Sequence, residues 1–145
     1  MRRAPFALLG ILVIACIVFA AMPHLAAPDW TVTVIDPTGR PMTGTRVHEV
    51  YRNFHCDSSD HESTASTNDL GVVHFPAQYE HRNPLECIMV TISNAQAPAH
   101  ASSASIASVF AFGPGGEASP TDAHGNTQQW TGSPPRIKSQ IMIKY

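Results

Sequence analysis

The sequence is short of charge. Charged residues make up 14% of its 145 residues, and the formal net charge is -2. A protein that binds nucleic acid needs a basic surface that releases counterions from phosphates, and this composition offers none. The length leaves room for one domain. We therefore expect a single, mildly acidic domain that does not bind nucleic acid.

The chain also lacks the short motifs that mark common catalytic and metal sites. It contains no Cys-x-x-Cys spacing, which excludes the usual cysteine-rich zinc sites. It contains no Gly-x-Ser-x-Gly elbow, and the glycine-rich run 113–116 is not followed by Lys-Ser or Lys-Thr, so it is not a phosphate-binding loop. From the sequence we expect no catalytic, cofactor-binding or metal-ligating residue and no enzymatic activity.

The longest apolar segment is at the N-terminus. Residues 4–22 are a run of 19 without a charge, and they follow Arg2 and Arg3. A basic start before an apolar run is typical of an export signal. The run also approaches the roughly 20 residues that span a bilayer as a helix. We expect residues 1–22 to be a signal peptide or a signal anchor (a transmembrane helix), residues 23–29 a linker, and residues 30–145 the exported domain.

Three alternatives for this segment stay open. It is retained as an anchor, it is cleaved before Ala21, or it is a lipoprotein signal with Cys16 as the lipidated residue. All three place the domain on the extracytoplasmic side, periplasmic or extracellular, as a membrane-anchored or secreted protein.

The two remaining cysteines, Cys56 and Cys87, fit that compartment. Two cysteines in an oxidising environment predict a disulfide. A bridge enclosing about 30 residues is worth roughly 3–4 kcal/mol in the loop-entropy model.

The first half of the domain reads as strands and turns. Trp30, Val32 and Val34 alternate with polar residues, which predicts a strand from 30 to 36. A turn at 36–39 and a second strand at 47–54 follow. Residues 55–66 are polar and predict a loop that ends in a short edge strand. A hairpin turn at 68–71 then leads into a strand at 72–75, which Pro76 stops.

The second half is harder to assign. Residues 77–84 predict a loop or a single helical turn, and Ile88, Val90 and Ile92 predict one face of a strand at 86–93. Cys87 would then point to the opposite face or lie at a strand end, so a bridge to Cys56 is expected to be peripheral. Residues 105–112 and 137–145 predict two more strands. The Gly- and Pro-rich stretch 113–135 predicts a long mobile loop. These elements add up to an all-β domain, a single antiparallel β-sandwich of about seven strands with no helix after the N-terminal segment.

The opening strands resemble a known family. The residues are Val34-Ile35-Asp36-Pro37-Thr38-Gly39-Arg40-Pro41, then Gly44-Thr45-Arg46-Val47, and later Thr67-Asn68-Asp69-Leu70-Gly71-Val72-Val73-His74-Phe75. This pattern resembles the carboxypeptidase regulatory-like domain, a prealbumin-like (transthyretin-like) β-sandwich. The resemblance covers residues 31 to about 93. It implies that fold, and because its matching residues shape turns and the core, it implies no particular activity.

One segment could carry chemistry. The segment 55–62 offers nitrogen, sulfur and oxygen ligands within eight residues. It reads His55-Cys56-Asp57-Ser58-Ser59-Asp60-His61-Glu62. The simpler interpretation is a solvated acidic loop. Trp130 lies alone in the expected loop, where it either docks on the β-sandwich or contacts a partner, and docking is the interpretation we adopt.

Together these observations predict a non-enzymatic, exported binding or structural domain of the cell envelope. Its expected partners are the membrane, through the N-terminal segment, and another envelope protein or a glycan. Two alternatives come from other classes of protein. One is a small metal-dependent enzyme or hydrolase with a site near residues 55–62. The other is an accessory domain that binds carbohydrate or peptide through the 113–135 loop.

Overall fold

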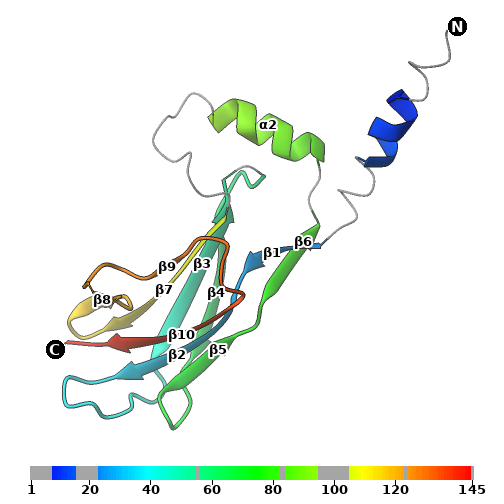
Figure 1. The fold of residues 1–145 in the computed structure, drawn as a ribbon. Coiled ribbons are helices and arrows are strands. Elements are labelled where there is room, and N and C mark those ends of the chain that lie inside the picture. Colours follow the sequence, from blue (N-terminus) through cyan, green and yellow to red (C-terminus); the bar gives the residue numbers. More distant parts are fainter. Residues whose placement is uncertain are drawn as a thin grey trace, which may run out of the picture.

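The computed structural model describes residues 8–15, 23–54, 56–81, 84–94, 105–122 and 124–144. Within these ranges the chain is mostly β (Figure 1). The elements in chain order are a helix over residues 8–15, β1 (Pro23–Ala27), β2 (Asp29–Ile35), β3 (Arg46–Asn53), β4 (His61–Ser66), β5 (Val72–Phe75), β6 (Gln78–His81), α2 (Pro84–Asn94), β7 (Ser105–Gly113), β8 (Gly116–Ala118), β9 (Gln129–Trp130) and β10 (Arg136–Met142).

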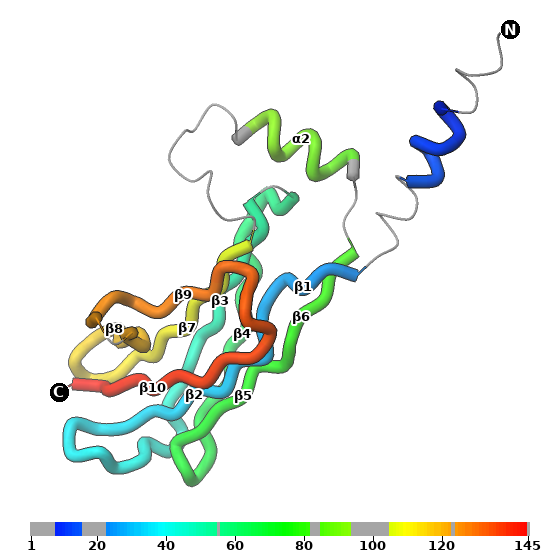
Figure 2. The backbone as a smooth tube through the Cα atoms, in the orientation of Figure 1, coloured from blue at the N-terminus to red at the C-terminus, as the bar shows by residue number. Residues whose placement is uncertain are grey.

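The strands form three sheets, which together we call the β domain. One has the order β10-β2-β5, a second has the order β4-β3-β7-β8 with β9 also paired to β7, and β1 and β6 form a two-stranded ribbon. All pairs between these strands are antiparallel except β10 with β2, which run parallel. The C-terminal strand therefore lies beside the first long strand (Figure 2). The all-β prediction is confirmed, and the parallel pair departs from the purely antiparallel arrangement that we expected.

Alternation along the strands builds the core. On β2 the predicted face of Trp30, Val32 and Val34 is fully buried. On β7 the inward face carries small residues, Ala107, Val109 and Ala111, which leave room for large neighbours. The buried cluster joins side chains from both larger sheets; its members are Ala27, Trp30, Val32, Val34, Val47, Val73, Phe75, Ala107, Val109, Ala111, Trp130, Ile141 and Ile143. Burial of this apolar surface is the main force that holds the sheets together.

The two predicted turns are present. The Asp36 carboxylate accepts hydrogen bonds from the backbone N–H groups of Thr38 and Arg40, at 2.8 and 2.9 Å. The Asn68 amide oxygen accepts in the same way from Leu70 and Val72, both at 3.0 Å. A short polar side chain that bonds to the backbone two and four residues later holds such turns without a sheet partner.

Gly71 closes the second turn in a position that no other residue fits. Its φ is +69°, and a Cβ added there would lie 2.7 Å from the carbonyl oxygen of Val34. We expect Gly71→Ala to lower the free energy of unfolding by about 2 kcal/mol, because it adds a clash to a left-handed backbone. Gly39→Ala is the matched control, since Gly39 has a φ of +82° and open space around it. Urea unfolding of both variants should show the smaller loss for Gly39→Ala, and equal losses would contradict the close approach.

Four predicted segments differ in the structure. The expected linker 23–29 is wrong, because residues 23–27 form β1, which pairs with β6 and buries Ala26 and Ala27. The expected loop at 77–84 is also wrong in part, since it contains β6. The short strands β1 and β6 pair with each other, and neither has the apolar alternation by which strands are usually recognised.

The predicted strand 86–93 is wrong as well, because this segment is the helix α2. Ile88, Val90 and Ile92 fit a period of two, but Leu85, Ile88, Met89 and Ile92 fit a helical period equally well. Pro84 at the first helical position favours the helix, since proline needs no hydrogen-bonded N–H there. The expectation of no helix after the N-terminal segment is therefore wrong.

The predicted mobile loop 113–135 contains regular structure. It holds β8, β9 and an isolated bridge between Thr121 and Thr127. Trp130 is 1% exposed, and its indole N–H donates to the carbonyl of Pro134 at 2.7 Å. The expectation that Trp130 docks is confirmed, and its burial helps to order a stretch whose composition suggested none.

The N-terminal segment is described only in part. The helix over residues 8–15 exposes large apolar side chains such as Leu8 and Ile11. No helix within the described ranges is long and apolar enough to span a membrane. Cys16 and Ala21, on which the lipoprotein and cleavage alternatives depend, lie outside the described residues, so all three alternatives stay predictions.

Candidate metal centre

A small polar cavity lies at the end of the β domain where β4 begins and β6 ends. Its volume is about 380 Å³. The lining residues come from β1, the turn between β3 and β4, β6 and α2; they are His24, Ala26, Asn53, Cys56, Asp57, Ser58, Ser59, His61, Glu80, His81, Glu86 and Cys87. Residues far apart in the sequence meet here, and most of them carry polar side chains.

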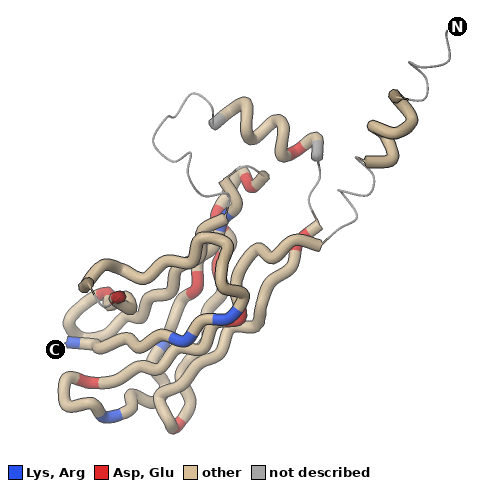
Figure 3. Tube along the Cα trace, viewed as in Figure 1, with Lys and Arg blue, Asp and Glu red and all other residues tan. Residues whose placement is uncertain are grey.

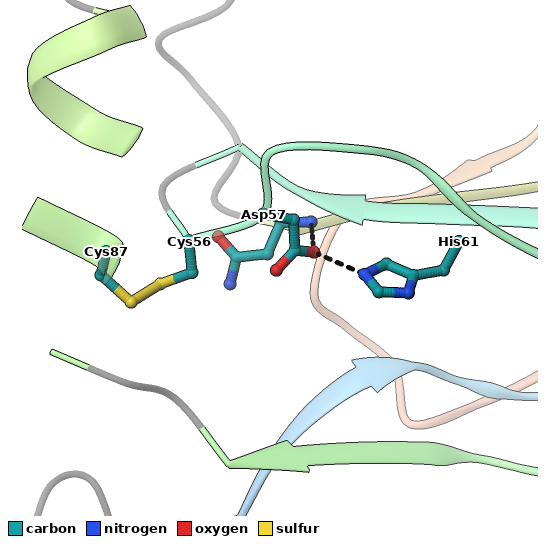
Figure 4. The surroundings of a disulfide bond; sticks show 5 residues. Cys56, Asp57, His61 and Cys87 are labelled. Carbon is teal, nitrogen blue, oxygen red and sulfur yellow. Dashed lines mark hydrogen bonds and ion pairs between the residues drawn. A yellow bond between two sulfur atoms is a disulfide. The ribbon is translucent and has the colours of Figure 1, made fainter. Parts of the chain in front are cut away.

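The disulfide between Cys56 and Cys87 closes one side of this cavity (Figure 4). It links the turn after β3 to the first turn of α2, so the predicted bridge is present and lies at the periphery, as expected. Backbone N–H groups of Cys56 and Asp57 both donate to the carbonyl of Asn53, at 3.0 and 2.7 Å. The bridge and these bonds together fix the backbone that carries Asp57.

Three of the lining side chains converge. The Nε2 atom of His61 lies 3.6 Å from Oδ2 of Asp57 and 3.9 Å from Oε1 of Glu80. One ligand atom from each residue falls within 4.8 Å of the other two. A tetrahedral zinc ion with bonds of about 2.0–2.2 Å holds its ligand atoms about 3.3–3.6 Å apart. The three side chains are thus close to the spacing that a bound ion requires.

Asp57 and His61 are held by their surroundings. Oδ2 of Asp57 accepts a hydrogen bond from the backbone N–H of Asn53 at 2.7 Å, which orients the carboxylate toward His61 (Figure 4). The imidazole of His61 stacks on the ring of Tyr51 at a centroid distance of 5.1 Å. Glu80 lies on β6 opposite His24 of β1, which brings a second imidazole to the same cavity. Such outer partners orient the groups that bind a metal.

The local field favours a cation. Burial raises the pKa of Tyr51, and three nearby carboxylates, led by that of Glu80, raise it further. Two of these carboxylates, Glu80 and Asp57, are themselves members of the cluster, and their negative charge attracts a positive ion. The three side chains are partly open to solvent, with 12% of Asp57, 41% of His61 and 32% of Glu80 exposed. An ion could therefore reach them and keep a position for water.

Sequence reasoning found only part of this cluster. Asp57 and His61 belong to the segment 55–62, which the sequence offered as a possible ligand set and which we interpreted as a solvated loop. His55 of that segment lies outside the described residues. Glu62 faces away from His61, on the exposed side of β4. Glu80 was missed because its segment was expected to be a loop. The segment Gln78–His81 has no apolar alternation, so its own sequence carried no clear signal for β6.

A larger hollow of about 800 Å³ lies between β10 and the 115–128 segment. It was the place where the carbohydrate or peptide alternative would put a ligand. Asp122, its aspartate, uses its carboxylate to hold its own turn, accepting from the N–H groups of His124 and Asn126. Within the described part of this hollow, no group of His, Cys, Asp and Glu ligands converges as at His61.

A cluster of three rings, of which Phe112 is exposed and the other two are half-buried, lies elsewhere. His48 stacks on Phe110 at 5.4 Å, and Phe112 meets both rings edge-on at 5.5 and 5.6 Å. This cluster lies on the outer face of β3 and β7, whereas Trp130 is buried. An aromatic contact with a partner would therefore involve the outer face and not Trp130.

Comparison of the chain with protein-family models, with curated proteins and with solved structures gives no significant match.

Proposed function

We propose that this chain is an exported β-sandwich binding domain, similar in fold to the carboxypeptidase regulatory-like domain, that binds a divalent transition-metal ion. The observation that carries the proposal is the convergence of Asp57, His61 and Glu80, whose ligand atoms lie within 4.8 Å of one another. The core shared by the two larger sheets supports the β-sandwich assignment.

The compartment is proposed on two features. The Cys56–Cys87 bridge fits an oxidising environment, where disulfides persist. The uncharged run 4–22 behind two arginines fits an export signal. Both point to the extracytoplasmic side of a membrane.

The donor atoms select the class of ion. One imidazole nitrogen and two carboxylate oxygens suit zinc and its neighbours better than calcium, which prefers six to eight oxygen ligands. His24 lines the same cavity and offers a further imidazole. Metal binding is proposed because the geometry carries it directly, and a metal-dependent hydrolase, whose nucleophile would be a metal-bound water, is the alternative use of the same residues.

Zinc titration of the full chain by calorimetry tests the proposal. We expect one site, and we expect His61→Ala and Glu80→Gln each to weaken binding by about 10–100-fold, the range seen when a metal site loses a supporting group. His74→Ala is the control. His74 is an exposed histidine on β5 whose Nε2 lies 2.9 Å from Asp29, outside the cavity.

Two results would reject the metal site. One is a wild-type chain that takes up no zinc after treatment with chelator and dialysis. The other is a His61→Ala variant that binds as tightly as His74→Ala. Far-UV circular dichroism of each variant separates lost ligation from lost folding.

A further inference from the structure

The helix α2 turns four large apolar side chains toward solvent. Leu85, Ile88, Met89 and Ile92 are 69%, 55%, 60% and 62% exposed. Their spacing of three, four and seven residues places them on one face, since an α-helix turns 100° per residue. Large apolar side chains gathered in one exposed patch mark a surface that contacts something. We call this set the apolar face of α2.

The opposite face of α2 is the one that is fixed. Cys87 lies about 150° around the helix from the centre of the apolar face, and its disulfide holds it to Cys56 beside β3. Cys87 and Val90 are half-buried, whereas the apolar face is not. The bridge therefore prevents α2 from turning over to bury its apolar side chains against the β domain.

The helix carries very little charge. Glu86 is its one ionisable side chain among the residues from 85 to 93, and no basic residue follows in the last turn (Figure 3). A surface that binds an acidic or basic partner carries charges of the opposite sign, and α2 has almost none. The occupant of this face is therefore apolar.

The position of α2 identifies that occupant. Pro23, where the chain leaves the apolar run 4–22, pairs with His81 of β6. The helix begins at Pro84, three residues after His81, at the same end of the β domain (Figure 1). If the apolar run lies in a bilayer, the entry to β1 lies at the bilayer surface, and α2 lies there too.

A second copy of the chain fits this face less well. A helix of 11 residues is about 16 Å long and about 10 Å wide. One face of it offers far less than the roughly 800 Å² per partner that a stable protein interface buries. A bilayer needs no such area from α2, because the N-terminal run already holds the chain to it.

We propose that α2 lies flat on the lipid bilayer, with Leu85, Ile88, Met89 and Ile92 in the boundary between headgroups and acyl chains. The inference rests on the expected membrane anchor and not on the metal site. Because α2 has no basic residue, its contact is apolar and does not depend on anionic lipid or on low salt. The contact would hold the cavity beside α2 close to the membrane surface.

The test uses the full chain in phosphatidylcholine vesicles with and without brominated lipid. Tryptophan is introduced at Ile88 or, as a second variant, at Met89, and Leu70→Trp is the control. Leu70 is 71% exposed in the turn between β4 and β5, at the opposite end of the β domain. The native Trp30 and Trp130 are buried and give the same background in every variant.

We expect brominated lipid to quench Ile88→Trp and Met89→Trp at least about twofold more than Leu70→Trp, since an interfacial helix places its apolar face about 5–10 Å into the boundary. Equal quenching of all three variants in chains that float with the vesicles would overturn the proposal and leave the anchor intact. Chains that do not float with vesicles would overturn both. A second copy of the chain would be the occupant if two results are found together. Without lipid, the emission of the Ile88→Trp variant shifts to the blue as the protein concentration rises; with brominated lipid, its quenching does not exceed that of Leu70→Trp. These results would overturn the proposal. None of these outcomes depends on zinc.

Discussion

Between about pH 4.5 and about pH 7, the free energy of unfolding is expected to fall by about 3 kcal/mol because of one residue, Glu49. Burial raises the pKa of Glu49 from 4.5 to about 7. In this interval the folded chain keeps a proton that the unfolded chain has released. The folded state therefore loses stability as the pH rises, and the full loss is present above the folded pKa.

The structure accounts for the direction of this shift. Glu49 is 0% exposed on the inward side of β3, where its register partner on β7 is Val109. Among the residues that the structure describes, neither carboxylate oxygen has a hydrogen-bond partner. An ionised carboxylate without partners is expensive in such surroundings, so the neutral acid is favoured. Tyr51, the nearest inward residue along β3, has its own pKa raised partly by the Glu49 carboxylate.

Urea unfolding at a series of pH values, with chelator present to remove metal effects, measures the fall. Glu49→Gln should remove most of it, because glutamine cannot ionise. Glu62→Gln is the matched control on β4, where Glu62 is exposed. If the free energy of unfolding falls equally with pH in the wild-type chain, in Glu49→Gln and in Glu62→Gln, then Glu49 is not the source of the pH dependence.

The parts of the fold that could be predicted from sequence are those that local chemistry determines. Trp30, Val32 and Val34 alternate because one face of β2 is buried, and Asp36 and Asn68 bond to their own turns. These signals need no knowledge of the rest of the chain. They locate most of the long strands and both turns correctly, but the turn at 68–71, expected to be a hairpin, joins β4 and β5 of different sheets.

The parts that could not be predicted depend on distant partners. The ribbon of β1 and β6 has little apolar alternation, and each strand is ordered mainly by the other. The apolar pattern of the α2 segment fits the period of a strand and that of a helix equally well. The contact that fixes this segment, the disulfide to Cys56, joins residues that are 31 positions apart in the sequence. The metal cluster has the same character, because Glu80 reaches Asp57 and His61 only through the pairing of β6.

Glu49 shows a different limit of sequence reasoning. In the sequence, a charged residue such as Glu49 between His48 and Val50 is expected to point outward from an irregular strand. Its burial follows from register, since Val47, Glu49, Tyr51 and Asn53 share the inward side of β3. A buried acid costs stability at neutral pH, and such a cost is often associated with function. Here the acid lies two residues from Tyr51, the ring on which the candidate ligand His61 stacks.

The second large effect is expected from the disulfide. Replacing Cys56 and Cys87 together by serine should lower the free energy of unfolding by about 3–4 kcal/mol, because the bridge closes a loop of 31 residues in the unfolded chain. The structure adds a local consequence. The bridge holds the turn that carries Asp57 and the first turn of α2, so zinc affinity should fall in the same variant.

Reductant provides the control for this comparison. Unfolding of the wild-type chain in dithiothreitol should match that of the Cys56→Ser/Cys87→Ser variant, and the variant itself should not respond to dithiothreitol. A loss well below about 1 kcal/mol would mean that the unfolded chain is already compact around this loop. Zinc titration of the folded Cys56→Ser/Cys87→Ser variant without reductant then separates the two roles of the bridge, since it leaves no free thiol in the cavity to bind zinc. If affinity stays unchanged, the hydrogen bonds from Cys56 and Asp57 to Asn53 are sufficient to hold the ligand turn, and the bridge serves mainly to fix α2.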